Sequence, residues 1–517
     1  MLATDILRRQ YKFNPDRVAA TFEGRAFSFR EMRERVLRAA NALRGLGVKK
    51  GDRVAVLAFN CHQYIELYFA NGLLGSVTTP LNFRLTPAEL EYIINDSEAV
   101  ALIVGQDLVA SIAPIRDRIP RVKHFVCIGD AEGMSDYEQW IAAAPAVEPG
   151  ETVGENDLLW QMYTSGTTGR PKGAMISHRN LITNVMQCSW EMPVRPGDCA
   201  LIVAPTYHAA AMITSMNALA GGGSLAIKKT FNPLEVLGAF QNEGVTHALL
   251  VPAMIQFMLT IPDIDKVNFG GLRYVIYGAS AIPLEVLRKA MHVFRCQFVQ
   301  GFGQTESTAI LTMLRPEDHV LDGPPEVVRR LQSCGREVIG CEVRVVNENG
   351  EEVKPGEIGE VIARGANVMQ GYWKLPEATA STLQDGWLHT GDLATVDEAG
   401  FVYIMDRIKD MIVSGGENVY PREIEEVLFT HPAVADAAVI GVPSEQWGEE
   451  VKAIVVLKPG ATASAQDLIG FCGERLAGYK RPRSVEFRPE LPKNPSGKVL
   501  KRELREPYWK DKARRVN

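Results

Sequence analysis

The fold is decided by the stretch Tyr163-Thr164-Ser165-Gly166-Thr167-Thr168-Gly169-Arg170-Pro171-Lys172-Gly173. It follows an apolar run at 158–162 that predicts a strand. Glycines permit tight turns that point backbone N–H groups at a phosphate, and the hydroxyls and Lys172 add donors and positive charge. The order GxxxxGK[ST] is absent, so this is not a Walker loop. The stretch predicts a polyphosphate-binding loop; the alternative, a plain surface loop, has little use for so many of these residues.

Helix and strand signals alternate on both sides of this loop. An amphipathic pattern at 30–46 and the capping box Thr86-Pro87-Ala88-Glu89 predict helices. Short apolar runs predict buried strands at 54–58, 77–81, 99–104, 199–204, 224–227, 248–251 and 274–277. Strands that alternate with helices indicate an α/β fold with parallel sheets.

The pattern changes near residue 341. Runs at 343–346, 358–363 and 401–404, separated by turn residues, predict a small β-rich module. A separate α+β unit follows, with helices expected at 421–429 and 465–476 and strands at 437–441 and 452–457. We therefore expect two domains, a large one over 1–406 and a small one over 407–517.

Composition excludes several classes of protein. The chain has 517 residues, of which 46% are hydrophobic and 23% charged, which is ordinary globular usage and excludes a mostly disordered chain, a collagen and a coiled coil. Its 56 Lys and Arg against 62 Asp and Glu give a net charge of −6, which argues against a nucleic-acid partner. The charge is uneven, because residues 475–517 hold 14 basic and 5 acidic residues. The eight cysteines form no CxxC pair, which indicates reduced thiols rather than disulfides or a zinc site.

We expect a soluble cytoplasmic protein. The first nine residues carry Asp5, Arg8 and Arg9 and lack the apolar core of a signal peptide. No apolar run reaches the roughly 18 residues that a membrane-spanning helix needs.

Two further clusters suit a nucleotide. In 300–306, Phe302 stands between Gly301 and Gly303, where a ring can stack on a base while the backbone approaches closely. Thr305 is placed to donate to a phosphate and Glu306 to hold magnesium. In 387–392, Asp392 suits a ribose diol. A turn after a strand is the plainer interpretation of either cluster taken alone.

Two more segments lie near the C-terminus. One is Asp406-Arg407-Ile408-Lys409-Asp410, which runs into a glycine pair, Gly415 and Gly416. The other is 492–498, which places Lys498 after a Pro/Ser/Gly turn. Taken alone, such a lysine is more often solvated charge than a functional group.

In this order, the five segments resemble the AMP-forming acyl-CoA synthetase family of the adenylating superfamily, which includes luciferases and peptide-synthetase adenylation domains. The resemblance covers roughly residues 11–505. It implies an N-terminal adenylating (AMP-binding) domain at 1–406, a mobile C-terminal domain at 407–517, and the substrates and cofactors ATP, Mg²⁺ and coenzyme A. It also implies two half-reactions, in which a carboxylate and MgATP give an acyl-adenylate and pyrophosphate, and the thiol of CoA then displaces AMP.

The resemblance also implies roles for particular residues. The loop would hold the β- and γ-phosphates of ATP with residues from both of its ends and its middle, namely Thr164, Ser165, Gly166, Thr167, Thr168, Gly169 and Lys172. Thr305 would contact the α-phosphate, Glu306 magnesium, and Asp392, with Arg407 beside it, the ribose. Lys498 would bridge the carboxylate and the α-phosphate. Lys409 would be the hinge, and Gly415 and Gly416 would line the pantetheine tunnel. Phe302 stands where the family often has tyrosine, so a phenolic hydrogen bond is not expected.

The acid pocket is expected at three segments that resemble the family's pocket walls, 206–212, 277–281 and 307–313. Its candidate residues are Tyr207, His208, Ala209, Met212, Gly278, Ala279 and Ser280, with His208 also a candidate catalytic group. A packed polar residue is the other interpretation of His208. Peptide-synthetase domains usually carry an Asp where this chain has His208-Ala209, which argues against an amino-acid substrate. The walls are small or apolar and lack Lys and Arg, which favours a neutral, hydrophobic tail.

The stretches 409–425 and 476–482 resemble most the medium- to long-chain fatty acid–CoA ligases, so we expect a ligase for a fatty acid of medium or long chain. An aryl acid of the hydroxycinnamate or benzoate type is the alternative, because the depth of the pocket is not readable from the sequence. A domain that loads a carrier protein and a luciferase-like oxidase are further alternatives. The partners expected are a small-molecule acid, ATP and CoA, with the chain a monomer or a homodimer.

Overall fold

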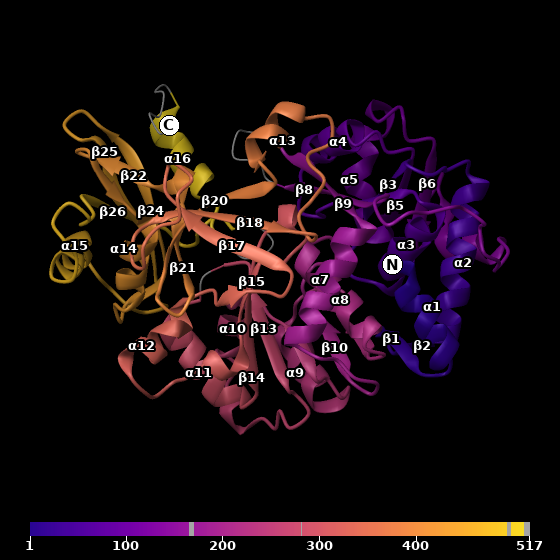
Figure 1. Ribbon diagram of the computed structural model, residues 1–517, viewed down its shortest axis with the longest axis horizontal. Coiled ribbons are helices and arrows are strands. Elements are labelled where there is room, and N and C mark those ends of the chain that lie inside the picture. The colour runs from indigo at the N-terminus through magenta and orange to yellow at the C-terminus, as the bar shows by residue number, and fades with distance from the viewer. Residues whose placement is uncertain (165–169, 281, 494–497, 511–517) are drawn as a thin grey trace.

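Two large sheets form the body of the protein in the computed structural model, which describes residues 1–164, 170–280, 282–493 and 498–510 (Figure 1). The first has the strand order β7-β6-β5-β3-β4-β8-β9. Its strands are β3 (Arg53–Leu57), β4 (Val77–Pro80), β5 (Ala101–Gly105), β6 (His124–Ile128), β7 (Ser135–Asp136), β8 (Leu158–Thr164) and β9 (Lys172–Ser177). All neighbours are parallel except β8 and β9, which form an antiparallel pair. The predicted phosphate loop joins that pair.

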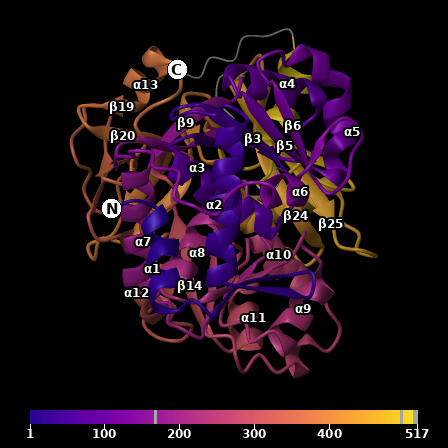
Figure 2. The ribbon, with the colours of Figure 1, turned by 90° about the vertical axis from the view of Figure 1, so that its right-hand side faces the viewer.

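Helices cover both faces of this sheet. Val54 and Val56 pack on one side with α2 (Phe29–Gly45) and α3 (His62–Leu74), while Ala55 and Leu57 pack on the other with α4 (Pro87–Asp96) and α5 (Val109–Ile112). Figure 2 shows α2 and α3 on the near side of the sheet. Both predicted helix starts are confirmed, because Ser28 with Glu31 and Thr86 with Glu89 form capping boxes.

The second large sheet has the order β16-β15-β14-β13-β12-β10-β11-β1-β2. Its strands are β1 (Val18–Phe22), β2 (Arg25–Ser28), β10 (Cys199–Ile202), β11 (Ser224–Ile227), β12 (His247–Leu249), β13 (Tyr274–Gly278), β14 (Gln297–Phe302), β15 (Thr312–Leu314) and β16 (Arg336–Glu337). The middle of the sheet is parallel and its edges are antiparallel. One face packs on α9 (Pro233–Asn242), α10 (Pro252–Met258) and α11 (Leu284–Phe294), and the other on α7 (His178–Glu191) and α8 (Ala209–Ala220).

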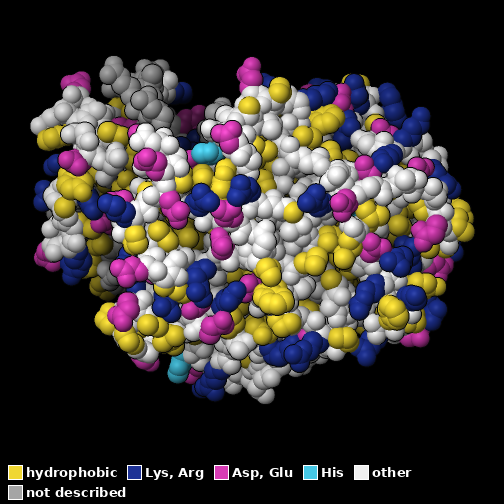
Figure 3. Space-filling view, in the orientation of Figure 1, with side chains coloured by type: hydrophobic (Ala, Val, Ile, Leu, Met, Phe, Trp, Pro, Cys, Tyr) yellow, Lys and Arg dark blue, Asp and Glu magenta, His cyan; other side chains and the backbone are white. Residues whose placement is uncertain are grey.

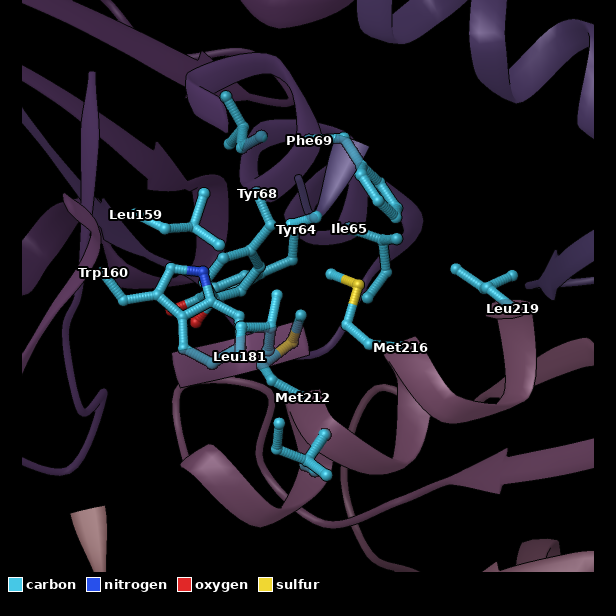
Figure 4. Packing of buried hydrophobic residues seen from close by; sticks show 14 of the residues in the cluster. Tyr64, Ile65, Tyr68, Phe69, Leu159, Trp160, Leu181, Met212, Met216 and Leu219 are labelled. Carbon is cyan, nitrogen blue, oxygen red and sulfur yellow. The ribbon is translucent and has the colours of Figure 1, made fainter. Parts of the chain in front are cut away.

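Helix α8 is buried between the two sheets. Met212 and Met216 of α8 point toward Tyr64 and Tyr68 of α3, and Trp160 of β8 closes the same cluster (Figure 4). The opposite side of α8 therefore faces the second sheet, as the 3.6-residue period requires. This orientation determines which residues of α8 line the space next to β13.

The remaining elements form two smaller sheets. An antiparallel module contains β17 (Cys341–Val346), β18 (Gly359–Gly365), β19 (Leu383–Gln384), β20 (Trp387–Val396) and β21 (Val402–Arg407). The C-terminal sheet contains β22 (Ile412–Ser414), β23 (Glu417–Val419), β24 (Val434–Ser444), β25 (Gly448–Leu457) and β26 (Ser484–Phe487), and it packs against α14 (Pro421–Phe429), α15 (Ala465–Gly473) and α16 (Lys501–Trp509). The predicted α/β fold, with a large N-terminal and a smaller C-terminal domain, is confirmed; the boundary at 406–407 stays a prediction.

The remaining described α-helices are α1 (Thr4–Phe13), α6 (Tyr137–Ala142), α12 (Pro325–Val328) and α13 (Pro376–Thr382). Of these, α1 and α6 pack in the same core cluster as α2, α3 and α8. All eight cysteines are free, as predicted. Among the described helices, none is long and apolar enough to cross a membrane. Basic and acidic side chains are interspersed on the face shown in Figure 3.

Candidate active site

Glu306 lies at the centre of the phosphate end of the site. It follows β14 in a short 3₁₀ turn (Thr305–Ser307) and is 7% exposed. Its Oε1 accepts hydrogen bonds from the hydroxyl of Thr164 at 3.2 Å and of Tyr372 at 2.7 Å. Thr164 is the last residue of β8, so this contact joins the two large sheets. The carboxylate is therefore oriented by two hydroxyl groups from distant parts of the chain.

These residues fit a magnesium ion. Magnesium prefers oxygen ligands, and proteins usually supply one or two carboxylates while substrate phosphates and water supply the rest. Both hydroxyls donate to Oε1 of Glu306, which leaves Oε2 for such a ligand. No cluster of three or more His, Cys, Asp or Glu suited to a metal occurs among the described residues, so a site shared with phosphates fits better than an all-protein cage.

The two ends of the predicted phosphate loop lie side by side. Thr164 pairs with Lys172 across β8 and β9, and Nζ of Lys172 is 4.9 Å from the ring centroid of Tyr372. A cation over an aromatic face is attracted by the negative charge of that face. The middle of the loop, Ser165, Gly166, Thr167, Thr168 and Gly169, lies outside the described residues.

Close packing of the backbone requires glycine directly after Phe302 and at the end of the neighbouring strand β13. A side chain at Gly278 would place its Cβ 2.2 Å from the carbonyl oxygen of Gly301, and one at Gly303 would be 2.1 Å from that of Ala309. Neither position therefore accepts a larger residue. Phe302 is half-buried between the body of the protein and the small β-module.

Two non-glycine residues at the site have left-handed backbones. Ala279 follows β13 with φ of 64°, and Thr308 follows Glu306 with φ of 69°. Such conformations cost of order 1 kcal/mol each and concentrate at functional sites. The hydroxyl of Thr308 donates to the Asn367 carbonyl at 2.7 Å, which helps to hold it in place.

The buried Asp392 and the half-buried Arg407 form an ion pair at the expected ribose end. They are register partners on β20 and β21, and Nε of Arg407 is 3.0 Å from Oδ1 of Asp392. The Asp392 carboxylate raises the pKa of Arg407. The pair fixes the position of the Asp392 carboxylate, whose oxygens can accept hydrogen bonds from a ribose diol.

Lys498 lies within electrostatic reach of this pair, although more than 90 residues separate it from either partner. Burial and the nearby charge of Arg407 lower the pKa of Lys498 to about 8, opposed by Asp392 and Asp410. Burial and Arg407 also lower the pKa of Lys409, which lies in the turn after β21. The structure thus brings Lys409 and Lys498 to the ribose end.

Helix α16 is docked on this turn by ion pairs that the sequence motifs did not reveal. Arg505 donates to Asp410 at 2.7 Å, and Lys501 is 2.9 Å from Glu425. Tyr372 at the phosphate end was also missed. No sequence signal marks these residues as partners, because each contact joins segments far apart in the chain.

The two glycines predicted to line the pantetheine tunnel lie in the C-terminal sheet. Gly415 and Gly416 form the exposed tip of the β22–β23 hairpin, with φ of 63° and 87°. A Cβ at Gly415 would lie 2.8 Å from the ring of Trp447, so the indole packs on the hairpin. Both glycines belong to the C-terminal sheet, and their role in CoA binding stays a prediction.

His208 marks the acid end of the site as the N-cap residue of α8. Its Nδ1 accepts a hydrogen bond from the backbone N–H of Ala210 at 3.3 Å, and burial lowers its pKa, which keeps the ring neutral. The ring of Tyr207 packs edge-on against Phe83, with a centroid distance of 5.3 Å. The hydroxyl of Tyr207 is buried without a hydrogen-bond partner among the described residues. Ala209 is buried, and Ser280 is partly exposed just after β13.

A small cavity of about 20 Å³ lies farther along the same helix, between α8 and the second sheet. Segment 188–194, at the end of α7 and beyond it, lines one side. The other lining residues come from α8 and the sheet, namely Thr214, Asn217, Ala218, Ala200, His247 and Ile276. Ala210 and Thr214 are one helical turn apart and both partly exposed, so this face of α8 leads from His208 to the cavity. Met212 lies on the opposite face, in the packing of Figure 4, so the structure does not bring it to this space.

Comparisons with known proteins agree with this geometry. A family model described as "AMP-binding enzyme" matches residues 7–373, and one described as "AMP-binding enzyme C-terminal domain" matches residues 423–498. The chain is 40% identical to a feruloyl-CoA synthase from Amycolatopsis sp over 499 residues, which cover 96% of this chain and 97% of that protein. It is 36% identical to the long-chain-fatty-acid–CoA ligase FadD13 of Mycobacterium tuberculosis over 482 residues, or 93% of both chains. The solved structure of the anthranilate CoA ligase AuaEII with anthranoyl-AMP superposes with a TM-score of 0.90 at 29% identity, covering 98% of this chain and 97% of that one.

Proposed function

This chain belongs to the AMP-binding enzyme family as an AMP-forming acyl-CoA ligase that uses ATP, Mg²⁺ and CoA, and we propose that its acid is a neutral, hydrophobic monocarboxylate. The observation that carries this proposal is the uncharged wall at the acid end of the site. Among the described residues, neither segments 206–212 and 277–280 nor the lining of the small cavity along α8 contain Lys, Arg, Asp or Glu. A second carboxylate or an ammonium group on the tail would be buried there without a counter-charge, which is costly.

In the first half-reaction, an oxygen of the acid's carboxylate attacks the α-phosphorus of ATP, and the bond from that phosphorus to the bridging oxygen of pyrophosphate breaks. A carboxylate is already ionised at neutral pH, so this step needs no general base. Its difficulty is the approach of two anions. We assign Lys498 to hold the carboxylate and the α-phosphate together, because positive charge at the transferring centre stabilises the transition state.

Other residues position the nucleotide for this step. Asp392, fixed by Arg407, accepts hydrogen bonds from the ribose hydroxyls. Thr305 donates to the α-phosphate, and Thr164 and Lys172 contact the outer phosphates. Glu306 would hold Mg²⁺, which neutralises phosphate charge when bound.

In the second half-reaction, the sulfur of CoA attacks the carbonyl carbon of the acyl-adenylate. The thioester C–S bond forms, the bond to AMP breaks, and the thiol proton passes to solvent. We propose that the C-terminal domain turns about Lys409 between the two steps, which would remove Lys498 and bring Gly415 and Gly416 to the pantetheine. Such a rotation would have to break the ion pair between Arg505 and Asp410 or carry both residues together.

The first candidate acid is a fatty acid of medium or long chain, and the 36% identity to the long-chain-fatty-acid–CoA ligase FadD13 supports it. A hydroxycinnamate-type acid fits as well, and the 40% identity to feruloyl-CoA synthases favours it as the second.

The test is AMP release and thioester formation with ATP, CoA and a panel of butanoate, decanoate, palmitate, benzoate, cinnamate and malonate. We expect CoA-dependent AMP release with decanoate, palmitate or cinnamate, and none with malonate. Absence of AMP with every acid would contradict the ligase assignment for these substrates. AMP release that does not need CoA and yields no thioester would favour a carrier-protein acceptor or an oxidase.

A further inference from the structure

The last turn of α4 contacts the chain on both sides of the predicted phosphate loop. On the β8 side, the hydroxyl of Tyr163 donates to Oδ2 of Asp96 at 2.5 Å. On the β9 side, the carbonyl of Pro171 accepts a hydrogen bond from the hydroxyl of Tyr92 at 3.3 Å. Tyr92 and Asp96 are four residues apart on α4, so one face of this helix meets both segments.

Tyr163 is the middle member of a chain of three polar side chains. Its oxygen accepts a hydrogen bond from Nε2 of Gln161 at 3.0 Å while its proton is donated to Asp96. A distance of 2.5 Å is typical of a hydroxyl that donates to a carboxylate, which is a stronger bond than one between neutral groups. Burial and this carboxylate raise the pKa of Tyr163, so the phenol keeps its proton at neutral pH. The phenol is therefore held from two sides in one position.

The neighbouring strand leaves room for this phenol. Tyr163 pairs with Gly173 across β8 and β9, and a Cβ at Gly173 would lie 3.1 Å from the ring of Tyr163 and 2.9 Å from Nε2 of Gln161. A side chain there would displace the phenol or the amide. The Gly173 carbonyl also accepts from the backbone N–H of Trp373 at 2.8 Å, and the indole of Trp373 donates to the Asp96 carbonyl at 3.1 Å. Both strands are thus tied to the end of α4.

These contacts lie next to the residues assigned to the outer phosphates. Thr164 directly follows Tyr163, Lys172 directly follows Pro171, and Thr164 and Lys172 are register partners. Side chains alternate along a strand, so a Tyr163 ring that faces α4 puts the Thr164 side chain on the other face. There its hydroxyl reaches Glu306 at 3.2 Å. The position of Tyr163 therefore determines the direction of the Thr164 hydroxyl.

We propose that Asp96 and Tyr163 are positioning residues for adenylation, and that their hydrogen bond holds Thr164 and Lys172 where the β- and γ-phosphates of ATP bind. The proposal rests on the proposed function, because it needs these ends of β8 and β9 to bind those phosphates. Donors that are in place before ATP arrives lose less conformational entropy on binding. Loss of the bond should therefore weaken the binding of ATP but not of a nucleotide that lacks the outer phosphates.

The first test compares the equilibrium binding of MgATP and of AMP by calorimetry, without acid, so that no adenylate forms. Tyr163→Phe removes the donor and Asp96→Ala removes the acceptor. A hydrogen bond to a charged group is worth about tenfold or more, so Kd for MgATP should rise about tenfold in either variant while Kd for AMP is unchanged. The double variant should bind as each single variant does, because both remove one bond. An unchanged Kd for MgATP, or equal weakening of MgATP and AMP, would overturn the proposal.

Two more variants separate positioning from general damage. Asp96→Asn keeps an oxygen that can accept from Tyr163, so it should recover part of the loss seen in Asp96→Ala. Tyr137→Phe is the matched control, because Tyr137 donates to the buried carboxylate of Glu66 at 2.9 Å but follows β7, at the opposite edge of the sheet from β9. It should bind MgATP as the wild type does. An Asp96→Asn variant as weak as Asp96→Ala, or a Tyr137→Phe variant as weak as Tyr163→Phe, would overturn the assignment.

The two proposals fail in different ways. If no acid supports CoA-dependent AMP release, the proposed function fails. If an acid is activated but Tyr163→Phe binds MgATP as tightly as the wild type, only the positioning by Asp96 and Tyr163 fails.

Discussion

The nucleotide end and the tail end of this site differ in the charge of the side chains that form them. At the nucleotide end, Arg407 pairs with Asp392, which raises the pKa of Arg407, while burial and Arg407 lower the pKa of Lys498. At the tail end, the described residues that line the cavity between α8 and β13 include no charged group, and Nε2 of His247 has no hydrogen-bond partner in the part of the chain that the structure describes. Loss of one charged group at the nucleotide end leaves another charge without its partner. A change at the tail end alters only the shape of the cavity or one neutral hydrogen bond. We therefore expect the reaction rate to depend on the nucleotide end and the choice of acid to depend on the tail end.

The largest effect is expected for Lys498→Ala. Removal of a positive group at the transferring centre should slow acyl-adenylate formation at least about 100-fold, as the loss of one oxyanion donor does. Thioester formation from a preformed acyl-adenylate should be kept, because that step does not use Lys498. Rapid-quench measurement of each half-reaction checks both statements.

Lys493→Ala is the control. Lys493 lies in the same segment as Lys498 and pairs with Asp436 at the surface of the C-terminal domain. Surface ion pairs are worth about 0–1 kcal/mol, so this variant should stay close to wild type. Equal loss of both half-reactions in Lys498→Ala would contradict the assigned role.

Asp392→Asn should have the next largest effect. It removes the charged acceptor for the ribose and leaves Arg407 without its partner, a change that costs about 3 kcal/mol in buried pairs. We expect KM for ATP to rise by about tenfold or more while KM for the acid changes little. Steady-state kinetics with ATP varied checks this, with the exposed Glu398→Gln as control. An unchanged KM for ATP would separate Asp392 from the nucleotide.

The pH dependence tests the same end without a mutation. The pKa of Lys498 is lowered to about 8, so its protonated form is lost as pH rises through that value. Acyl-adenylate formation should fall to half near pH 8 and by about tenfold for each further unit. Lys498→Arg should keep its charge and shift this fall to higher pH. An adenylation rate that stays flat from pH 7 to 10 would show that this proton is not needed.

The smallest effect on rate is expected at the tail end. Ala218 is 1% exposed and lines the cavity, so Ala218→Leu should fill part of it. Loss of room for one or two methylene groups is worth about 1–3 kcal/mol, so kcat/KM for decanoate should fall about tenfold while that for butanoate is kept. Met216→Leu, on the opposite face of α8, is the control. Equal loss for both acids would mean that the tail does not reach this cavity.

The sequence predicted most of the fold because its signals are local. Ser28 with Glu31 and Thr86 with Glu89 cap helices through contacts three residues apart. The apolar runs that became β3, β5 and β13 are short and bounded by turn residues. The segments expected to bind the nucleotide also have their own composition, so they were visible one at a time.

The orientation of α8 was not visible in the same way. Its sequence AAAMITSMNALA is apolar on nearly every side, so the helical period does not show which face meets the sheet. We expected Met212 at the acid pocket because segment 206–212 resembles a pocket wall of the family, and that placement stays a prediction. In the structure Met212 packs toward Tyr64 and Tyr68, while Thr214 and Ala218 lie at the cavity.

The basic C-terminal segment 475–517 shows a limit of charge counts. Several of its cations are paired within the protein, because Lys480 binds Glu423, Lys501 binds Glu425 and Arg505 binds Asp410. Charge counts do not reveal pairing, which depends on which segments meet in space.

By itself, the sequence determined the order of the elements, the family and the segments that carry the chemistry, because hydrophobic period, capping and turn residues act over a few positions. Only the tertiary structure decided that Tyr372 and Thr164 share Glu306, that Lys498 lies near Asp392 and Arg407, and which face of α8 lines the cavity. Those outcomes come from the packing of two sheets and a terminal domain. They depend on contacts between residues tens to hundreds of positions apart, on which no local pattern bears.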